Sequence, residues 1–256
     1  MLSDAELSET AAEFGVAEDQ VRRDHLISHL LRAVAHVDSP LTFFGGTALA
    51  RTHLTDPARG GRLSEDIDLH TPERARLASD LDSALPRALR REFPSLAWDP
   101  ALSRTKHLEP ASLVTGDGLR VRVQLIDSRD HHELRSWPSE QREVSLRYSD
   151  LPTSVTMSVP TLPAFVAMKT VAWLDRRTAR DLYDLAALAN LGAITSEAAD
   201  LYRRVAGVQI TPHYFDRQAC GDWESQLRHQ TLDPGTPEAA LATVISAFAH
   251  VLGWDK

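Results

Sequence analysis

FFGGTAL at residues 43–49 and RLSEDIDL at residues 62–69 decide the fold of this chain, because they join a glycine turn to two alternating carboxylates. The apolar run before the glycines indicates a buried strand that turns into a helix over Thr47–His53. Side chains two apart on a strand share a face, so a strand at Asp66–His70 points Asp66 and Asp68 to one side and its apolar residues into a core. Two like charges at this spacing repel each other, which favours a Mg²⁺ or Mn²⁺ ion between them.

The glycine turn is itself compatible with a phosphate site. Gly45 and Gly46 permit a close approach that a Cβ would block, and amides at the start of the following helix can hold phosphate oxygens. The hydroxyls of Thr47 and Ser64 can donate further hydrogen bonds, although Ser64 can also merely cap a turn. A Gly-Gly turn alone is commonly structural, so the functional prediction depends on its combination with the two carboxylates.

The rest of the chain divides into helical and strand-forming regions. Helical periodicity predicts one or two helices within residues 4–38, and a helix from about Pro72 that is interrupted near Pro86. Period-two alternation predicts strands at 96–98, 103–108, 119–126, 143–148 and 154–159. Four helices are predicted beyond Pro160, at 162–176, 180–191, 196–205 and 237–252. We therefore predict an α+β fold with an N-terminal helical segment (1–38) packed on a sheet domain (39–159), followed by a helical domain (160–256).

The composition is that of a folded protein without a membrane span. Of 256 residues, 43% are hydrophobic and 25% charged, and no apolar run approaches the roughly 20 residues that a spanning helix needs. The start is acidic and polar and the one cysteine, Cys220, cannot form an internal disulfide, so we expect a cytoplasmic protein. The net charge of -8 argues against a protein that coats nucleic acid, and leaves only local basic patches for such contacts.

One of these patches contains a lysine in an apolar setting. On one continuous helix, Lys169, Trp173, Arg176 and Arg180 would fall on a single stripe that suits a nucleoside triphosphate. Arg176 can instead complement the dipole at the end of one helix. That alternative does not explain Lys169, because an unpaired ammonium among apolar side chains is costly.

Two histidines, His25 and His29, are four residues apart, as zinc ligands on a helix can be. No third ligand accompanies them in the sequence, so we interpret them as ordinary helix residues.

Taken together, these motifs resemble the AbiEii family of nucleotidyltransferase toxins, which includes the mycobacterial MenT group and the toxins of type IV toxin–antitoxin and abortive-infection systems. The resemblance covers about residues 20–190 and rests on the glycine turn, the R-x-S-x-D-I-D-L motif, Lys169 and RDLYDL at residues 180–185. It implies a DNA polymerase β-like nucleotidyltransferase fold and transfer of nucleotides from an NTP, in some members onto the 3′ end of tRNA. A cognate antitoxin is the other partner that it implies.

The resemblance also implies roles for single residues. Asp66 and Asp68 would bind Mg²⁺, Lys169 would meet phosphate and Asp184 would support catalysis. The residues predicted to bind the nucleotide are Gly45, Gly46, Thr47, Arg62, Ser64, Lys169, Arg176 and Arg180.

One departure from the usual pattern concerns the third carboxylate that such enzymes place on a neighbouring strand. The corresponding side of residues 119–126 offers Arg120, Arg122 and Gln124. Either Asp127 reaches the site through a bulge, or Asp184 acts as the base, or a second metal is weakly held. Two alternatives to nucleotide transfer onto RNA stay open. One is transfer of a nucleotide or a phosphate to a protein side chain, including a partner antitoxin, and the other is a catalytically silent module that only binds nucleotide or partner.

Overall fold

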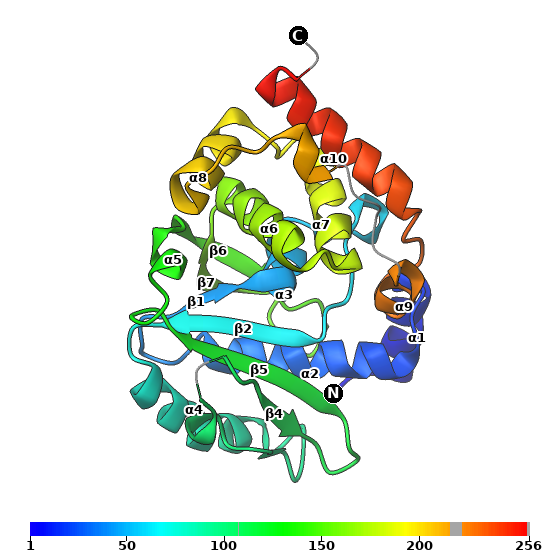
Figure 1. Ribbon diagram of the computed structural model, residues 1–256. Coiled ribbons are helices and arrows are strands. Elements are labelled where there is room, and N and C mark those ends of the chain that lie inside the picture. Colours follow the sequence, from blue (N-terminus) through cyan, green and yellow to red (C-terminus); the bar gives the residue numbers. More distant parts are fainter. Residues whose placement is uncertain (107, 216–221, 255–256) are drawn as a thin grey trace. The chain divides into compact units, whose positions relative to one another are not determined.

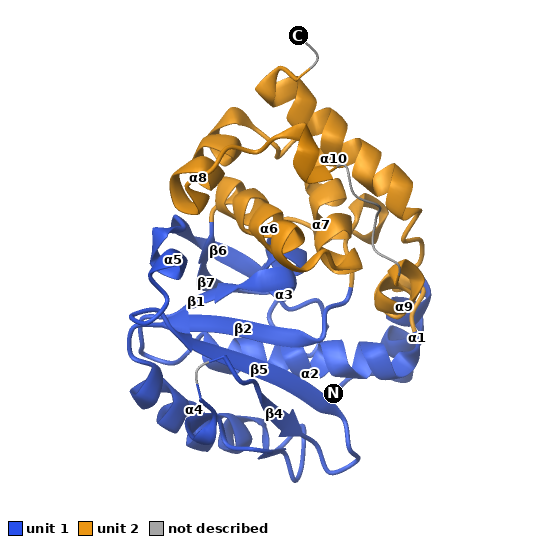
Figure 2. Ribbon diagram, viewed as in Figure 1, with its two compact units in different colours: residues 1–13, 17–52, 63–160 blue, residues 14–16, 53–62, 161–256 orange. Residues whose placement is uncertain are grey.

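The computed structural model describes all residues except 107, 216–221 and 255–256, so Cys220 lies outside the described residues. The chain forms two compact units (Figure 2). Unit 1 comprises residues 1–13, 17–52 and 63–160, and unit 2 comprises residues 14–16, 53–62 and 161–256. Each unit therefore draws on separate stretches of the chain, and the predicted division into three consecutive segments stays a prediction.

Unit 1 is built on a five-stranded sheet with the order β1-β2-β5-β4-β3 (Figure 1). Its strands are β1 (Thr42–Phe44), β2 (Asp66–Thr71), β3 (Ala97–Trp98), β4 (Ala111–Val114) and β5 (Arg120–Asp127). The central strands β2 and β5 run parallel, and the other neighbours run antiparallel. A separate antiparallel hairpin joins β6 (Ser139–Ser145) to β7 (Ser154–Pro160).

Helices and short turns connect these strands. They are α1 (Asp4–Phe14), whose last residue belongs to unit 2, α2 (Glu18–Val34), α3 (Gly45–Thr52), α4 (Arg74–Leu89), η2 (Leu102–Arg104) and α5 (His132–Ser136). Helices α2 and α4 pack against each other and against β5, and Figure 1 shows α2 passing behind β2 and β5. The alternation of β2 explains this packing, because Ile67 and Leu69 are buried while Asp66, Asp68 and His70 are partly exposed.

Unit 2 is helical. Its elements are η1 (Pro57–Arg59), α6 (Leu162–Arg176), α7 (Ala179–Asn190), α8 (Ser196–Ala206), η3 (Pro212–Phe215), α9 (Trp223–Leu227) and α10 (Pro237–Leu252). Threonine side chains cap the starts of α6, α8 and α10, at Thr161, Thr195 and Thr236. Gly207 and Gly253 end α8 and α10 in the left-handed conformation that glycine adopts without strain.

The structure confirms most predicted elements and corrects some. Helix α4 continues through Pro86, because buried Leu81, Leu85 and Leu89 hold that face of the helix although one backbone hydrogen bond is lost. The strand predicted at 103–108 is wrong for the described residues, where η2 stands instead. Strand β4 was missed because its residues, apart from Val114, are buried and show no alternation.

Among the described residues, every helix is too short or too polar to cross a membrane.

Candidate functional site

The two carboxylates of β2 form the centre of the candidate site in unit 1. Asp66 and Asp68 lie on the same, partly exposed face of the strand, as predicted from their spacing. In the register of the sheet, Asp68 stands opposite Phe44 of β1 on one side and Gln124 of β5 on the other. The start of α3 therefore follows directly from the residue that pairs with Asp68.

Gly45 is the residue that brings the glycine turn against this face. It begins α3 with a φ of 80°, and a Cβ added to it would collide with the carboxylate of Asp68. Both features exclude a larger side chain at this position. The Thr47 hydroxyl donates to the backbone carbonyl of Asp66, so it ties α3 to β2.

Arg122 occupies the position next to Asp66 on β5. Its guanidinium makes a two-pronged contact with the Asp66 carboxylate, with Nε–Oδ1 and Nη2–Oδ2 distances of 2.8 and 2.6 Å. The hydrogen bonds to Asp66 raise the pKa of Arg122, although partial burial opposes the shift. About half of the Arg122 side chain is exposed, so it can swing away when another cation approaches Asp66.

The remaining positions on this face offer no third carboxylate among the aligned residues of β5. Arg120, Arg122 and Gln124 face this side, and Gln124 donates to the carbonyl of Leu108 at 2.5 Å. The register of β2 and β5 is unbroken up to Asp127, which lies on the opposite side and pairs with Arg129 at 2.6 Å. The proposed bulge that would bring Asp127 into the site is therefore absent.

Ser64 precedes β2 and is buried. The neighbouring Glu65 accepts a hydrogen bond from Arg23 of α2 at 2.8 Å, so the segment before Asp66 is anchored to the helix behind the sheet.

A second group of predicted residues forms an ion cluster around two buried carboxylates within unit 2. The guanidinium of Arg62 donates two hydrogen bonds, of 2.8 and 2.9 Å, to the carboxylate of Asp184 on α7. Lys169 of α6 lies 2.5 Å from Asp184 and 3.2 Å from Asp181. Arg176 completes the cluster with bonds of 2.6 and 2.9 Å to Asp181. The apolar setting of Lys169 is thus explained by two carboxylate partners from the next helix.

This cluster keeps its carboxylates ionised although they are buried. Burial by itself raises the pKa of Asp184, but the attraction of Arg62 and Lys169 lowers it below the ordinary value. The pKa of Asp181 is likewise lowered, since Arg176 and Lys169 outweigh its burial. An ionised Asp184 holds the ammonium of Lys169 in a fixed position.

The predicted cationic stripe is wrong in its geometry. Helix α6 ends at Arg176 because Arg177 adopts a left-handed conformation, and Arg180 belongs to α7. Trp173 is fully buried, with the guanidinium of Arg177 5.5 Å from its ring centre. Lys169 and Arg176 are brought together by Asp181, a residue that the motif RDLYDL contains but that helical periodicity does not identify as their partner.

The structure thus gathers the predicted residues into two sets. Gly45, Gly46, Thr47, Ser64, Asp66 and Asp68 belong to unit 1, whereas Arg62, Lys169, Arg176, Arg180 and Asp184 belong to unit 2. The meeting of Lys169 with Asp66 and Asp68 stays a prediction. The sequence assigned no role to Arg122, which contacts Asp66. Its position on the open face of β5 was predicted.

The family model for the nucleotidyl transferase AbiEii toxin of type IV toxin–antitoxin systems matches residues 29–242. The chain belongs to this family. Among solved structures, MenT4, a nucleotidyltransferase toxin from Mycobacterium tuberculosis H37Rv, is 19% identical with a TM-score of 0.68. That match covers 98% of this chain and 90% of MenT4.

The structure of JHP933 from Helicobacter pylori is also similar, at 17% identity and a TM-score of 0.53. It covers 94% of this chain and 95% of JHP933. No curated protein matches the sequence. The AbiEii chain is therefore a nucleotidyltransferase with the α+β fold of its family, and the helices before and after the sheet agree with the predicted architecture.

Proposed function

We propose that this AbiEii protein transfers nucleotides from an NTP to the 3′ end of an RNA such as tRNA, in a reaction that needs a divalent metal. The observation that carries the proposal is the pair Asp66 and Asp68 on the open face of β2, with Gly45 at the start of α3 directly against Asp68. The tRNA acceptor is taken from the resemblance to characterised toxins. NTPs and tRNA are cytoplasmic molecules, so we expect the protein to act there, under control of a cognate antitoxin.

The residues present fit one magnesium ion. Mg²⁺ commonly binds through one or two carboxylates and fills its other positions with water and substrate phosphate oxygens, which Asp66 and Asp68 allow. The missing third carboxylate argues against a second, equally tight ion, because Gln124 cannot supply its charge. A bound Mg²⁺ or Mn²⁺ would polarise the α-phosphate of the NTP and offset its charge.

The chain's own residues would hold and orient the nucleotide. The first amides of α3 and the hydroxyl of Ser64 can donate to the phosphate oxygens. From unit 2, Lys169, Arg62, Arg176 and Arg180 would offset the charge of the leaving pyrophosphate. Lys169 can do so while it contacts Asp181 and Asp184, because an ammonium has three N–H donors.

The reaction is an in-line displacement. The 3′-hydroxyl oxygen of the acceptor forms a new bond to the α-phosphorus as the bond to the pyrophosphate oxygen breaks, and the hydroxyl proton passes to a base. A water molecule is the base that we favour, because Asp66 and Asp68 would hold the metal, whereas Asp184 acts as a positioning residue because it already binds Lys169 and Arg62. Catalysis would depend mostly on positioning and charge.

The test is incubation of the pure protein with Mg²⁺, each labelled NTP in turn, and either total tRNA or cell protein. Label on tRNA supports the proposal, and Asp68→Asn is expected to reduce it by about 10²–10³-fold. Asp127→Asn is the matched control, since it removes one carboxylate from the neighbouring strand on the other face of the sheet. Label on protein would instead make a protein, such as the antitoxin, the acceptor. Bound NTP without any transfer would favour a silent module.

A further inference from the structure

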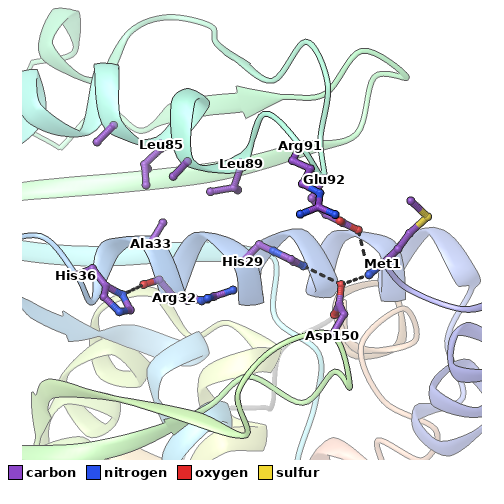
Figure 3. A pocket seen from close by; sticks show the side chains of 12 residues that line it. Met1, His29, Arg32, Ala33, His36, Leu85, Leu89, Arg91, Glu92 and Asp150 are labelled. Carbon is purple, nitrogen blue, oxygen red and sulfur yellow. Dashed lines mark hydrogen bonds and ion pairs between the residues drawn. The ribbon is translucent and has the colours of Figure 1, made fainter.

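A second cluster of possible metal ligands lies in unit 1, away from the sheet face of Asp66 and Asp68. His25 and His29 of α2, Glu92 after α4 and Asp150 between β6 and β7 place their ligand atoms within 4.8 Å of one another. Figure 3 shows His29, Asp150 and Glu92 converging at one end of a pocket. The sequence had offered only the two histidines, and the fold supplies the further ligands that they lacked.

The spacing of three of these atoms matches the geometry of zinc. Nε2 of His25 is 3.2 Å from Nε2 of His29, and these nitrogens lie 3.2 and 3.3 Å from Oδ2 of Asp150. Zinc–nitrogen and zinc–oxygen bonds of roughly 2.0–2.1 Å in a tetrahedral site separate neighbouring ligand atoms by about 3.3 Å. A single ion can therefore lie at bonding distance from all three atoms with little movement of the side chains.

We propose that His25, His29 and Asp150 bind a zinc ion, with Glu92 or a water molecule as the fourth ligand. The two histidines follow the four-residue helical spacing that is common in zinc sites. Two carboxylates and two neutral imidazoles carry a charge that one divalent cation balances. The ion would tie α2 to the end of α4 and to the β6–β7 connection, three segments far apart in the sequence.

A positive charge is already accommodated at this place. The α-ammonium of Met1 lies 2.6 Å from Oδ2 of Asp150 and 3.6 Å from Oε1 of Glu92. Zinc would compete with this ammonium for Asp150, so the two cations are alternative occupants of the same carboxylates. This competition leads to a separate prediction, namely that zinc binding releases the amino terminus from Asp150.

The surrounding side chains hold the imidazoles in place. The rings of His25 and Tyr148 meet edge-on with centres 4.9 Å apart, and Phe93 packs against both histidines. Tyr148 is itself fixed, because its hydroxyl donates to Asp24 at 2.9 Å. Such an ordered outer layer lowers the cost of gathering the ligands around an ion.

The cluster also has access from solvent. A cavity of about 650 Å³ is lined by His29, Glu92, Asp150 and the facing residues of α2 and α4, as Figure 3 shows.

The test uses the full-length protein, stripped of metal with a chelator and dialysed. Zinc is then added back. We expect mass spectrometry of metals to find one Zn²⁺ per chain, and we expect the melting temperature to rise. Co²⁺ in place of zinc should give the intense visible absorption of a tetrahedral site. The amino terminus should become more reactive toward an acylating reagent when zinc is bound.

Three variants define the site. His29→Ala should lose at least tenfold in zinc affinity, whereas His36→Ala, two residues beyond the end of the same helix and lining the same cavity, should bind zinc as the unaltered chain does. Asp68→Asn should also keep the zinc, which separates this ion from the metal of the transfer reaction. Equal binding by the His29→Ala variant, or an octahedral Co²⁺ spectrum of the unaltered chain, would overturn the proposal. Because the spectrum needs no mutation, the proposal can fail even if His29→Ala does not fold.

Discussion

The two pairs of aspartates in this protein have opposite environments. Asp66 and Asp68, two apart on a strand, share an open face, and the Asp66 side chain is 25% exposed with one surface arginine as partner. Asp181 and Asp184, three apart on a helix, are almost fully buried and share the cations of Arg62, Lys169 and Arg176.

This difference in burial and partners indicates which aspartate pair binds ligands and which pair positions neighbouring cations. An exposed carboxylate can exchange its partner for a metal or substrate at small cost. A buried carboxylate with several cationic partners cannot, since each of them would be left with an uncompensated charge. We therefore assign ligand binding to β2 and the fixing of cations to α7.

The largest expected effect is on stability at the buried pair. Asp184→Asn removes the negative charge with which both Arg62 and Lys169 pair. It should lower the free energy of unfolding by roughly 3–5 kcal/mol. Urea unfolding measures the change. The matched control is Asp80→Asn, which removes an exposed partner 3.8 Å from Arg76 and should cost less than about 1 kcal/mol. Equal, small losses in both variants would remove the contrast between the two aspartate pairs.

Gly45→Ala tests how closely α3 approaches the open pair. The positive φ alone should cost about 1–2 kcal/mol, and the added methyl group should also push the Asp68 carboxylate aside and reduce transfer activity. Gly118→Ala has a similar φ of 89° but open space around the added Cβ. We expect Gly118→Ala to lose only stability, so the difference between the variants isolates the contact with Asp68. Similar activity in both would show that this contact does not matter.

His70 provides a pH test on the same face of β2. Burial lowers its pKa to about 4, below an ordinary value near 6.5. Between these values the unfolded chain takes up a proton that the folded chain does not, so stability falls as the pH drops from about 6.5 to 4. We expect this group to contribute on the order of 1–2 kcal/mol of that fall, which His70→Asn should remove. Unfolding curves at pH 7 and pH 4 measure it, and an unchanged difference in the variant would contradict the assignment.

The smallest expected effect concerns the arginine on Asp66. Arg122→Gln should change stability by less than about 1 kcal/mol, because the contact is half exposed. Mg²⁺ should activate the variant at a several-fold lower concentration, since it no longer competes with a guanidinium. Arg120→Gln, two residues away on the same face of β5, is the control and should leave the magnesium dependence unchanged. A higher magnesium requirement in Arg122→Gln would instead make Arg122 a helper in binding phosphate.

Local sequence patterns were sufficient to predict a helix, strand or turn where the environment of that element is uniform along its length. The alternation at β2 and β5, the turn at Gly45 and the boundaries of α6 and α10 all follow from residues close in sequence. Patterns failed where burial is complete or the element is short, as at β4, because nothing alternates there.

The sequence by itself determined the α+β fold, the shared face of Asp66 and Asp68, and membership of the AbiEii family, because each depends on short periodicities and motifs. Only the tertiary structure decided which charges meet. It placed Arg122 on Asp66, Asp184 between Arg62 and Lys169, and Asp150 beside His25 and His29. These partners are separated by 15 to 125 residues, and chain folding, unlike helix or strand periodicity, fixes contacts across such separations.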